Sequence, residues 1–214
     1  MELIDLLLAF FRYRMKIHYL LAAIAAFVSC SAMADYISNG DLKQLLKEKP
    51  IWCRDLGTDG TCSSVMHYGS IADDSIPVSE YTLLSHPSLL LKLKTVSPAK
   101  FNKSGLCVTI DEAYANALTA FVTANDFARI TSNDQAFNEK AQSEFSSKMA
   151  DQLRPQFGKE YCGRYEISKR NAEEEISEVK ATYFLQDVQQ PFPLTFYTLF
   201  PEGSENVRLK AMTQ

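Results

Sequence analysis

The sequence predicts an α+β protein, in which an antiparallel meander sheet has two or three helices packed on one side and is held by two disulfides. Three observations lead to this prediction. Apolar residues recur with helical spacing in several segments, and the spacing changes to the two-residue period of strands after Tyr161. Four cysteines follow an N-terminal segment that is typical of an export signal.

The N-terminal segment has the layout of a secretory signal peptide. Basic residues within 12–16 precede an apolar run over 17–28, and an Ala-x-Ala step ends at Ala34. A membrane-spanning helix needs about 20 consecutive apolar residues, and this run is shorter. We therefore expect residues 1–34 to be cleaved after Ala34, which leaves one secreted α+β domain over 35–214 and no transmembrane span after processing.

The true start and the type of signal stay open. The true start is Met1 or Met15. We interpret the residues before Met15 as an over-called leader, that is, a stretch that lies upstream of the true start. The alternative to cleavage after Ala34 is a lipoprotein signal, in which Cys30 is acylated and anchors the protein to a membrane. Phe27 is a poor residue three places before such a cysteine, so we favour the Ala-x-Ala site.

Length and charge limit the class of protein. Residues 35–214 suit a single domain, and they retain 19 of the 22 lysines and arginines and 24 of the 26 acidic residues. Nucleic-acid binding requires clustered positive charge, which an acidic chain of this kind does not offer overall. We therefore expect no nucleic-acid partner.

An even number of cysteines in the exported part predicts two disulfides. Cys53 and Cys62 flank an Asp-Gly step, which is a strong signal for a tight turn. We favour a disulfide between these two cysteines. Cys107 and Cys162 then pair by elimination, and their bond closes a long loop.

A first helix is predicted between Ser38 and Pro50. The Ser38 hydroxyl can cap its first turn, and Pro50 ends it. Its apolar face consists of Leu42, Leu45 and Leu46.

The next segments are predicted from alternation and from turn composition. They are a hairpin of strands 51–56 and 62–68, a loop over 69–79, extended segments over 81–85 and 89–96, a turn-rich stretch over 97–105 and a strand over 106–110.

Two helices are predicted in the middle of the chain. The first starts at Asp111, and its apolar side consists of Tyr114, Leu118, Phe121 and Val122. The second is capped within 132–134 and ends at Pro155 and Gly158. Its apolar stripe consists of Phe137, Ala141, Phe145, Met149 and Leu153.

The last third alternates with a period of two. We predict consecutive strands over 161–167, 179–185, 194–200 and 207–209, joined by short turns. Strands that follow one another in this way favour an antiparallel meander.

The sequence contains no recognisable catalytic or cofactor motif. His67 and His86 are the only histidines of the exported part, and neither lies beside a nucleophile elbow. The cysteine spacings fit no zinc motif, and we find no phosphate-binding or haem-attachment motif. We therefore predict no cofactor and no metal, and assign no catalytic residue. Paired carboxylates leave no local pattern, so a hydrolase of cell-wall or carbohydrate substrates is the alternative.

Together these features predict a periplasmic or secreted, disulfide-stabilised binding or protein-interaction module of a bacterial cell envelope. Its partner would be an envelope protein or a small ligand. The strands of the last third are rich in aromatic residues, which suit a binding face. The predicted ligand-binding residues are Tyr161, Tyr165, Tyr183, Phe196 and Tyr197. A second alternative is an outer-membrane lipoprotein anchored through Cys30.

Overall fold

The computed structural model describes residues 36–86, 89–123, 135–191, 194–204 and 207–212. The predicted signal peptide, the over-called leader, the lipid anchor and the caps predicted for the second middle helix all lie outside these residues.

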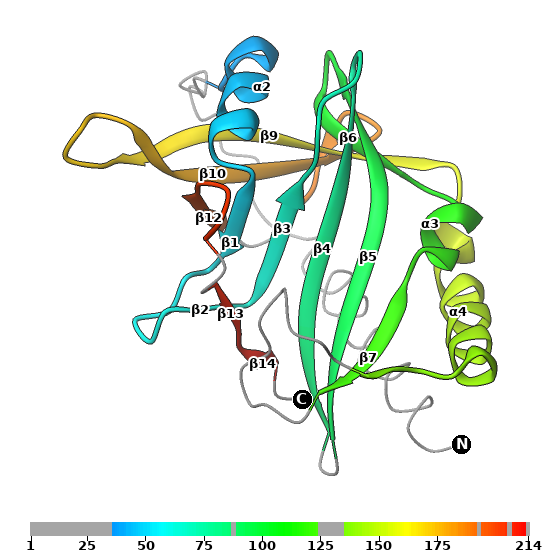
Figure 1. Ribbon diagram of the computed structural model, residues 1–214. Coiled ribbons are helices and arrows are strands. Elements are labelled where there is room, and N and C mark those ends of the chain that lie inside the picture. The colour runs from blue at the N-terminus through cyan, green and yellow to red at the C-terminus, as the bar shows by residue number, and fades with distance from the viewer. Residues whose placement is uncertain (1–35, 87–88, 124–134, 192–193, 205–206, 213–214) are drawn as a thin grey trace, which may run out of the picture.

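Eight antiparallel strands form a closed β-barrel (Figure 1). In the chain order given next, each barrel strand pairs with the one that follows it, and the last strand pairs with the first. The barrel strands are β1 (Ile51–Arg54), β3 (Ser64–Tyr68), β4 (Ser75–His86), β5 (Leu89–Asn102), β6 (Gly105–Ile110), β9 (Lys159–Arg170), β10 (Ile176–Leu185) and β12 (Thr195–Phe200).

Helices and short strands complete the described structure. The helices are α2 (Asn39–Glu48), α3 (Glu112–Asn116), α4 (Glu139–Leu153) and the 3-10 turn η2 (Arg154–Gln156). The short strands are β2 (Thr61–Cys62), β7 (Thr119–Thr123), β8 (Gln135–Ala136), β11 (Val188–Gln189), β13 (Arg208–Leu209) and β14 (Ala211–Met212).

The predicted α+β class is wrong, because the chain is mostly strand and its main sheet is closed. We predicted an open sheet with helices along one side. Instead β12 returns to β1, with Ile51 opposite Phe200 and Arg54 opposite Tyr197. Closure turns one face of every barrel strand inward, so the barrel interior takes the place of the expected layer between sheet and helices.

Two prolines explain why the longest strands were predicted too short. Pro77 and Pro98 lie directly opposite each other in β4 and β5, in segments predicted as a loop and as turns. The Pro77 carbonyl accepts a hydrogen bond from Gly69 on the side away from β5, just beyond the end of β3. The missing N–H of Pro77 therefore falls where no ladder bond to β5 is required.

The first helix matches its prediction. Ser38 caps α2, since its hydroxyl accepts a hydrogen bond from the Asp41 amide. The three predicted leucines are buried and pack with Trp52 and Phe101 in one core cluster. The Trp52 indole N–H donates to the Lys49 carbonyl at 2.8 Å, which ties the end of α2 to the start of β1. Helix α2 thus covers one end of the barrel (Figure 1).

The helix predicted after Asp111 is much shorter than expected. Asp111 caps α3 as predicted, but the helix ends at Asn116. Phe121 and Val122 belong instead to β7, which pairs with β5. β-branched residues favour a strand over a helix, and this segment contains several of them.

The second middle helix is present with a different cap. Asn138 caps α4 by accepting from the Ala141 amide. Phe145 and Met149 are buried on its inner face, against Leu91 and Leu93 of β5. Pro155 lies in η2 directly after the helix, where the end was predicted.

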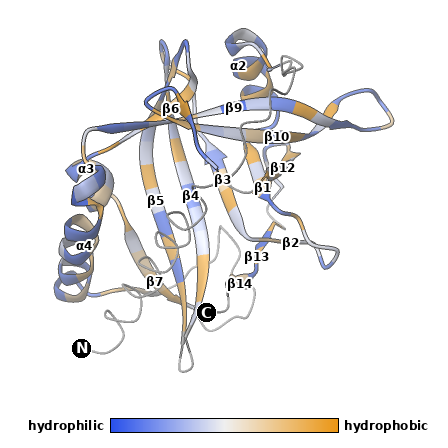
Figure 2. Ribbon diagram, turned by 180° about the vertical axis from the view of Figure 1, so that it is seen from behind, coloured by the Kyte–Doolittle hydropathy of each residue, from blue (hydrophilic) through white to orange (hydrophobic). Residues whose placement is uncertain are grey.

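The predicted fourth strand of the meander does not join the meander. Strand β13 pairs in parallel with β2, and β14 pairs in parallel with β4. Hydrophobic residues recur along β3, β4 and β5 (Figure 2), and on the outer face of the barrel Val65 and Leu83 pack against Val207 and Leu209. The C-terminal strands therefore cover the outside of the barrel.

Both predicted disulfides are confirmed. Cys53 bonds to Cys62, and Cys107 bonds to Cys162. The second pair occupies directly opposite positions of β6 and β9. Among the described residues, no helix is both long and apolar enough to cross a bilayer.

The two disulfides should contribute unequally to stability. The Cys107–Cys162 bond spans 55 residues and the Cys53–Cys62 bond spans 9. All four cysteines are buried, so replacing either pair by alanine changes the packing to a similar extent. In the chain-entropy model, the Cys107/Cys162 double alanine variant loses about 1.5 kcal/mol more than the Cys53/Cys62 variant. Urea unfolding of both variants measures the difference. Equal losses, or a larger loss for the short loop, would contradict this account.

Gly105 is predicted to be intolerant of a side chain. Its φ is +117°, and a Cβ atom there would lie 2.3 Å from the Gly163 carbonyl oxygen on β9. We expect Gly105→Ala to lower the free energy of unfolding by about 2 kcal/mol or more.

Gly203 is the matched control for this substitution. It also has positive φ, but nothing lies within 4 Å of its Cβ position. Gly203→Ala should lower the free energy of unfolding by about 1 kcal/mol, because it adds only backbone strain. If both variants lose the same stability in urea unfolding, the close approach of β6 and β9 is not what requires glycine at 105.

Candidate functional site

The register of the strands shows which residues face the barrel interior. Directly opposite residues in an antiparallel ladder lie on the same side of the sheet. Trp52 is opposite both Leu199 and Met66, and it packs in the core cluster under α2. Positions that share its face are therefore inward, and Arg54 and Glu80 are among them.

Polar inward residues form a layer between two apolar clusters. Along β4, Ile76 and Val78 belong to the cluster under α2, and Leu84 belongs to the cluster under α4. Glu80 and Thr82 lie between them. We call this set the polar layer; it consists of Arg54, Ser64, Glu80, Thr82, Thr95, Tyr183 and Tyr197.

Solvent reaches the barrel interior around the polar layer. Seven of the eight barrel strands carry an inward residue that is only partly buried. These residues are Arg54, Met66, Glu80, Thr95, Val108, Tyr161 and Tyr183. An eight-stranded barrel is either filled by side chains or leaves room for one small ligand. The interior around the polar layer is therefore partly exposed to solvent.

The Arg54 guanidinium supplies the positive charge of the polar layer. Burial would lower its pKa, but the tyrosines Tyr197 and Tyr183 and the carboxylates of Asp55 and Glu80 outweigh that effect and raise the pKa. Its Nε atom lies 3.4 Å from Asp55 Oδ2, and the side chain is 26 % exposed. Arg54 thus stays charged and is partly reachable from solvent.

Two polar atoms of the layer have no hydrogen-bond partner in the described part of the chain. They are Arg54 Nε and Ser64 Oγ, and both are shielded from solvent. Arg54 and Ser64 lie directly opposite each other in β1 and β3. A buried polar group without a partner costs about 1–3 kcal/mol. The layer therefore has unused hydrogen-bonding capacity at one point.

The tyrosines form a contiguous aromatic wall. The hydroxyls of Tyr183 and Tyr197 are hydrogen-bonded to each other. Tyr165 packs edge-on against Trp52 with ring centroids 5.0 Å apart, and the rings of Tyr165 and Tyr197 are 6.5 Å apart. Burial raises the pKa of Tyr183 and Tyr165, and raises that of Tyr197 well above its ordinary value.

Four of the five predicted ligand-binding residues face the interior. Tyr165 and Tyr197 are buried, and Tyr161 and Tyr183 are partly exposed. The Tyr161 hydroxyl donates to Gln156 Oε1 at 2.9 Å. Phe196 alternates with inward Tyr197 and Thr195, so it lies on the outer face and away from the other four.

Arg54, Ser64 and Glu80 were missed by the sequence prediction. Arg54 follows Trp52 by two residues, and Glu80 follows Val78 by two. A charge in the inward register of an otherwise apolar strand face is the signal that could have identified them. The signal was hidden for Glu80 because the residues before it were interpreted as a loop.

A concave site lies at the end of the barrel covered by α2. It is a groove of about 290 Å³ that includes Tyr36, Asn39, Lys103 and Arg164 in its lining. Arg164 is already engaged, since its Nε donates to the Ser104 carbonyl and its guanidinium lies over the rings of Tyr36 and Phe184. The polar layer, with its unpartnered groups, is the better candidate.

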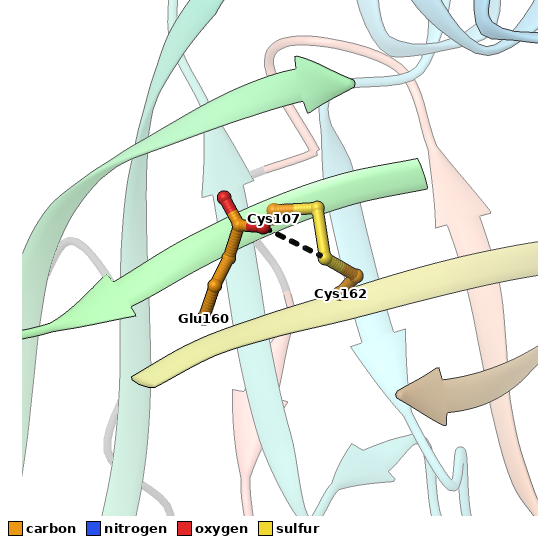
Figure 3. Close-up of side chains that lie close together, drawn as sticks. All are labelled: Cys107, Glu160 and Cys162. Carbon is orange, nitrogen blue, oxygen red and sulfur yellow. Dashed lines mark hydrogen bonds between the residues drawn. A yellow bond between two sulfur atoms is a disulfide. The ribbon is translucent and has the colours of Figure 1, made fainter. Parts of the chain in front are cut away.

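One cluster of metal-ligand types occurs within the described residues. It consists of Cys107, Glu160 and Cys162 (Figure 3), whose ligand atoms lie within 4.8 Å of one another. The two sulfurs form a disulfide, so no thiolate is available to a metal. Asn102 donates to Glu160 Oε2 at 3.1 Å. The cluster therefore joins two strands and offers no open ligand set.

Acidic residues and histidines of the kinds used in catalysis have other roles at the following described positions. Asp74 pairs with Lys43 at 2.6 Å, and Asp111 caps α3. His67 lies 3.3 Å from Glu202 on the outer surface. These contacts are ordinary surface and capping interactions.

Comparisons with protein-family models, with curated protein sequences and with solved structures found no match to this chain.

Tyrosines with raised pKa values should make the protein unstable in alkali. The described tyrosines with raised pKa are Tyr68, Tyr114, Tyr165, Tyr183 and Tyr197. The unfolded chain loses tyrosine protons near pH 10, whereas the folded chain keeps them. The protein therefore keeps its full free energy of unfolding below about pH 10 and loses part of it as the pH rises further.

Urea unfolding as a function of pH, with tyrosinate absorbance recorded in parallel, tests this expectation. Tyr165→Phe should remove one late-titrating tyrosine and make the alkaline loss of stability less steep. If all tyrosines of the native protein titrate together near pH 10, the interior is more hydrated than the burial of these rings implies.

Proposed function

We propose that the chain is an exported, disulfide-stabilised binding protein of a bacterial cell envelope, and that it holds a small ligand inside its barrel. The observation that carries the proposal is the group of partly exposed polar side chains that face the barrel interior at the polar layer. A barrel that served only as a rigid spacer would gain stability from apolar side chains at these inward positions. Partly exposed arginine, glutamate and tyrosine side chains are the residue types with which a binding cavity fixes and orients a ligand.

Export is supported by the signal-like N-terminal segment and by the two disulfides. Disulfides form and persist outside the reducing cytosol. In this chain one of them joins neighbouring barrel strands, and the other joins β1 to β2 beside Arg54. The Cys53–Cys62 disulfide thus holds β1, the strand that carries Arg54 of the polar layer.

The binding function is favoured over the hydrolase considered from the sequence. A hydrolase with paired carboxylates requires two acids facing one substrate. Within the described residues, Glu80 is the only acidic residue whose register places it in the polar layer. Asp55 lies in the turn after β1, where it contacts Arg54.

The proposal is tested by asking whether the native protein carries a compound in its barrel. The protein is isolated without denaturation from cells that produce it, and small molecules are released and identified by mass spectrometry. Thr95→Trp should remove the compound, because an indole at this inward position of β5 occupies the interior beside the polar layer.

The adjacent position supplies the control. Val96 is 40 % exposed on the outer face of the same strand, so Val96→Trp should retain the compound. Equal retention by both variants would place any compound outside the barrel. The absence of a compound from the unmodified protein, with the barrel folded, would count against the binding function.

A further inference from the structure

We propose that the groove beside the start of α2 is a second binding site, which takes the phosphate group of a small organic phosphate. The site is separate from the polar layer, so it goes beyond the proposed function and does not depend on it. The groove has a volume of about 290 Å³, which suits a small ligand. It lies between the N-terminal segment at Tyr36, the turn at Lys103 that joins β5 to β6, and the backbone of β9 at Gly163.

Two positive side chains line this groove. Lys103 is exposed and Arg164 is partly buried, so water reaches both residues. None of the lining residues carries a carboxylate. Among the residues that the structure describes, no ion pair joins either cation to an acid. The groove therefore presents two positive charges to a ligand.

The Arg164 guanidinium is held in place by contacts that leave its terminal nitrogens unused. Its Nε donates to the Ser104 carbonyl at 3.0 Å. The guanidinium carbon lies 4.4 Å from the ring centroid of Phe184 and 5.8 Å from that of Tyr36. In the described part of the chain, neither Nη atom has an acceptor. A guanidinium fixed in this way loses little freedom on binding, and its two Nη atoms can donate side by side to one oxyanion.

A disulfide fixes the two walls that carry these cations. The Cys107–Cys162 bond joins β6 to β9 (Figure 3) and packs with Phe184 in one buried cluster. The turn that carries Lys103 leads directly into β6, and Arg164 lies on β9. The two positive charges are therefore held near each other before any ligand binds.

The acids around the groove have partners outside it. Glu166 on β9 pairs with Lys180 at 2.8 Å. Asp41 is exposed and accepts from the hydroxyl that caps α2. Asp187 accepts from the Ser104 hydroxyl. None of these three acids lines the groove, so a ligand inside it meets the cations first.

Two cations favour a doubly charged group. A phosphate monoester carries a charge of about −1.5 to −2 at pH 7 and has three acceptor oxygens. It can accept from both Nη atoms of Arg164 and from the Lys103 ammonium together. A carboxylate or a sulfate ester carries a single charge, so the same cations attract it less strongly. A phosphate is accordingly the anion that the groove matches best.

The rest of the lining favours an organic group on the phosphate. Ile37 and Leu42 supply apolar side chains, and Tyr36 supplies an aromatic ring. The Asn39 amide nitrogen donates to the Asn102 carbonyl at 2.9 Å, which leaves the Asn39 amide oxygen as an acceptor for a ligand hydroxyl. The small volume restricts the organic group to one of modest size.

Calorimetry on the purified protein, with its disulfides intact, measures the binding of three probes at neutral pH. Phenyl phosphate is the expected ligand type. Phenyl sulfate has nearly the same shape with a single charge, and inorganic phosphate lacks the organic group. Phenyl phosphate should bind about tenfold more tightly than either of the other two, because only it uses both cations and the apolar wall.

Variants of the two cations test their roles. Arg164→Met should weaken phenyl phosphate binding about tenfold or more, and Lys103→Met should weaken it severalfold. Arg164→Lys retains the charge and loses the two-pronged geometry, so its affinity should lie between those of the unmodified protein and Arg164→Met. Because Lys103 is exposed, Lys103→Met keeps the test decisive even if Arg164→Met fails to fold.

The matched controls are exposed cations on the same elements. Arg170 lies towards the far end of β9, and Lys47 lies in the last turn of α2. Arg170→Met and Lys47→Met should bind phenyl phosphate as the unmodified protein does. Thermal unfolding of each variant shows whether it is folded.

The inference is overturned if phenyl phosphate does not bind, or if neither Lys103→Met nor Arg164→Met weakens its binding. Equal affinity for phenyl sulfate or for inorganic phosphate also overturns it. Sedimentation with phosphatidylcholine vesicles that contain phosphatidic acid gives a further test, because this lipid carries the same phosphate group. The protein should stay in solution; sedimentation that Lys103→Met abolishes would assign the groove to a lipid head group instead. None of these outcomes bears on a compound held inside the barrel, which Thr95→Trp tests separately.

Discussion

Pairing of the last barrel strand with the first is the constraint on which the structure depends. The ladder between β12 and β1 places Trp52 opposite Leu199 and Arg54 opposite Tyr197. Without it, these side chains would lie on the open face of a sheet and in water. With it, they share an interior in which an aromatic core under α2 passes into the polar layer. The same closure removes exposed strand edges from the barrel.

The molecule stabilises this closure from several directions. Helix α2 covers one end with its leucines, and α4 packs on the extension of β4 and β5 beyond the barrel. The two disulfides act at the strands, one joining β6 to β9 and the other β1 to β2. Apolar packing therefore concentrates away from the polar layer, which is left as the place where the interior is polar and reachable by solvent. A binding site can be polar there without weakening the core around it.

Local rules explain why some features were predicted correctly. The Ser38 cap, the leucine face of α2 and the Asp-Gly turn between Cys53 and Cys62 depend on residues close in sequence. Their physics is nearly independent of the rest of the chain. Where tertiary context decided, prediction was wrong. Pro77 and Pro98 tolerate strand pairing because their missing N–H groups fall outside the shared ladder, and Val122 joined a strand because β5 offered it a partner.

By itself, the sequence determined the ends of α2, the turn that favours pairing of Cys53 with Cys62, and the aromatic character of the last strands, because each follows from short-range spacing or composition. Tertiary structure alone decided that the sheet closes, and closure decided what faces inward. Tyr183, Tyr197 and Arg54 meet only through the β10, β12 and β1 ladders. Their neighbours are set by strand register across more than a hundred residues, and such long-range pairing leaves no mark in any single segment.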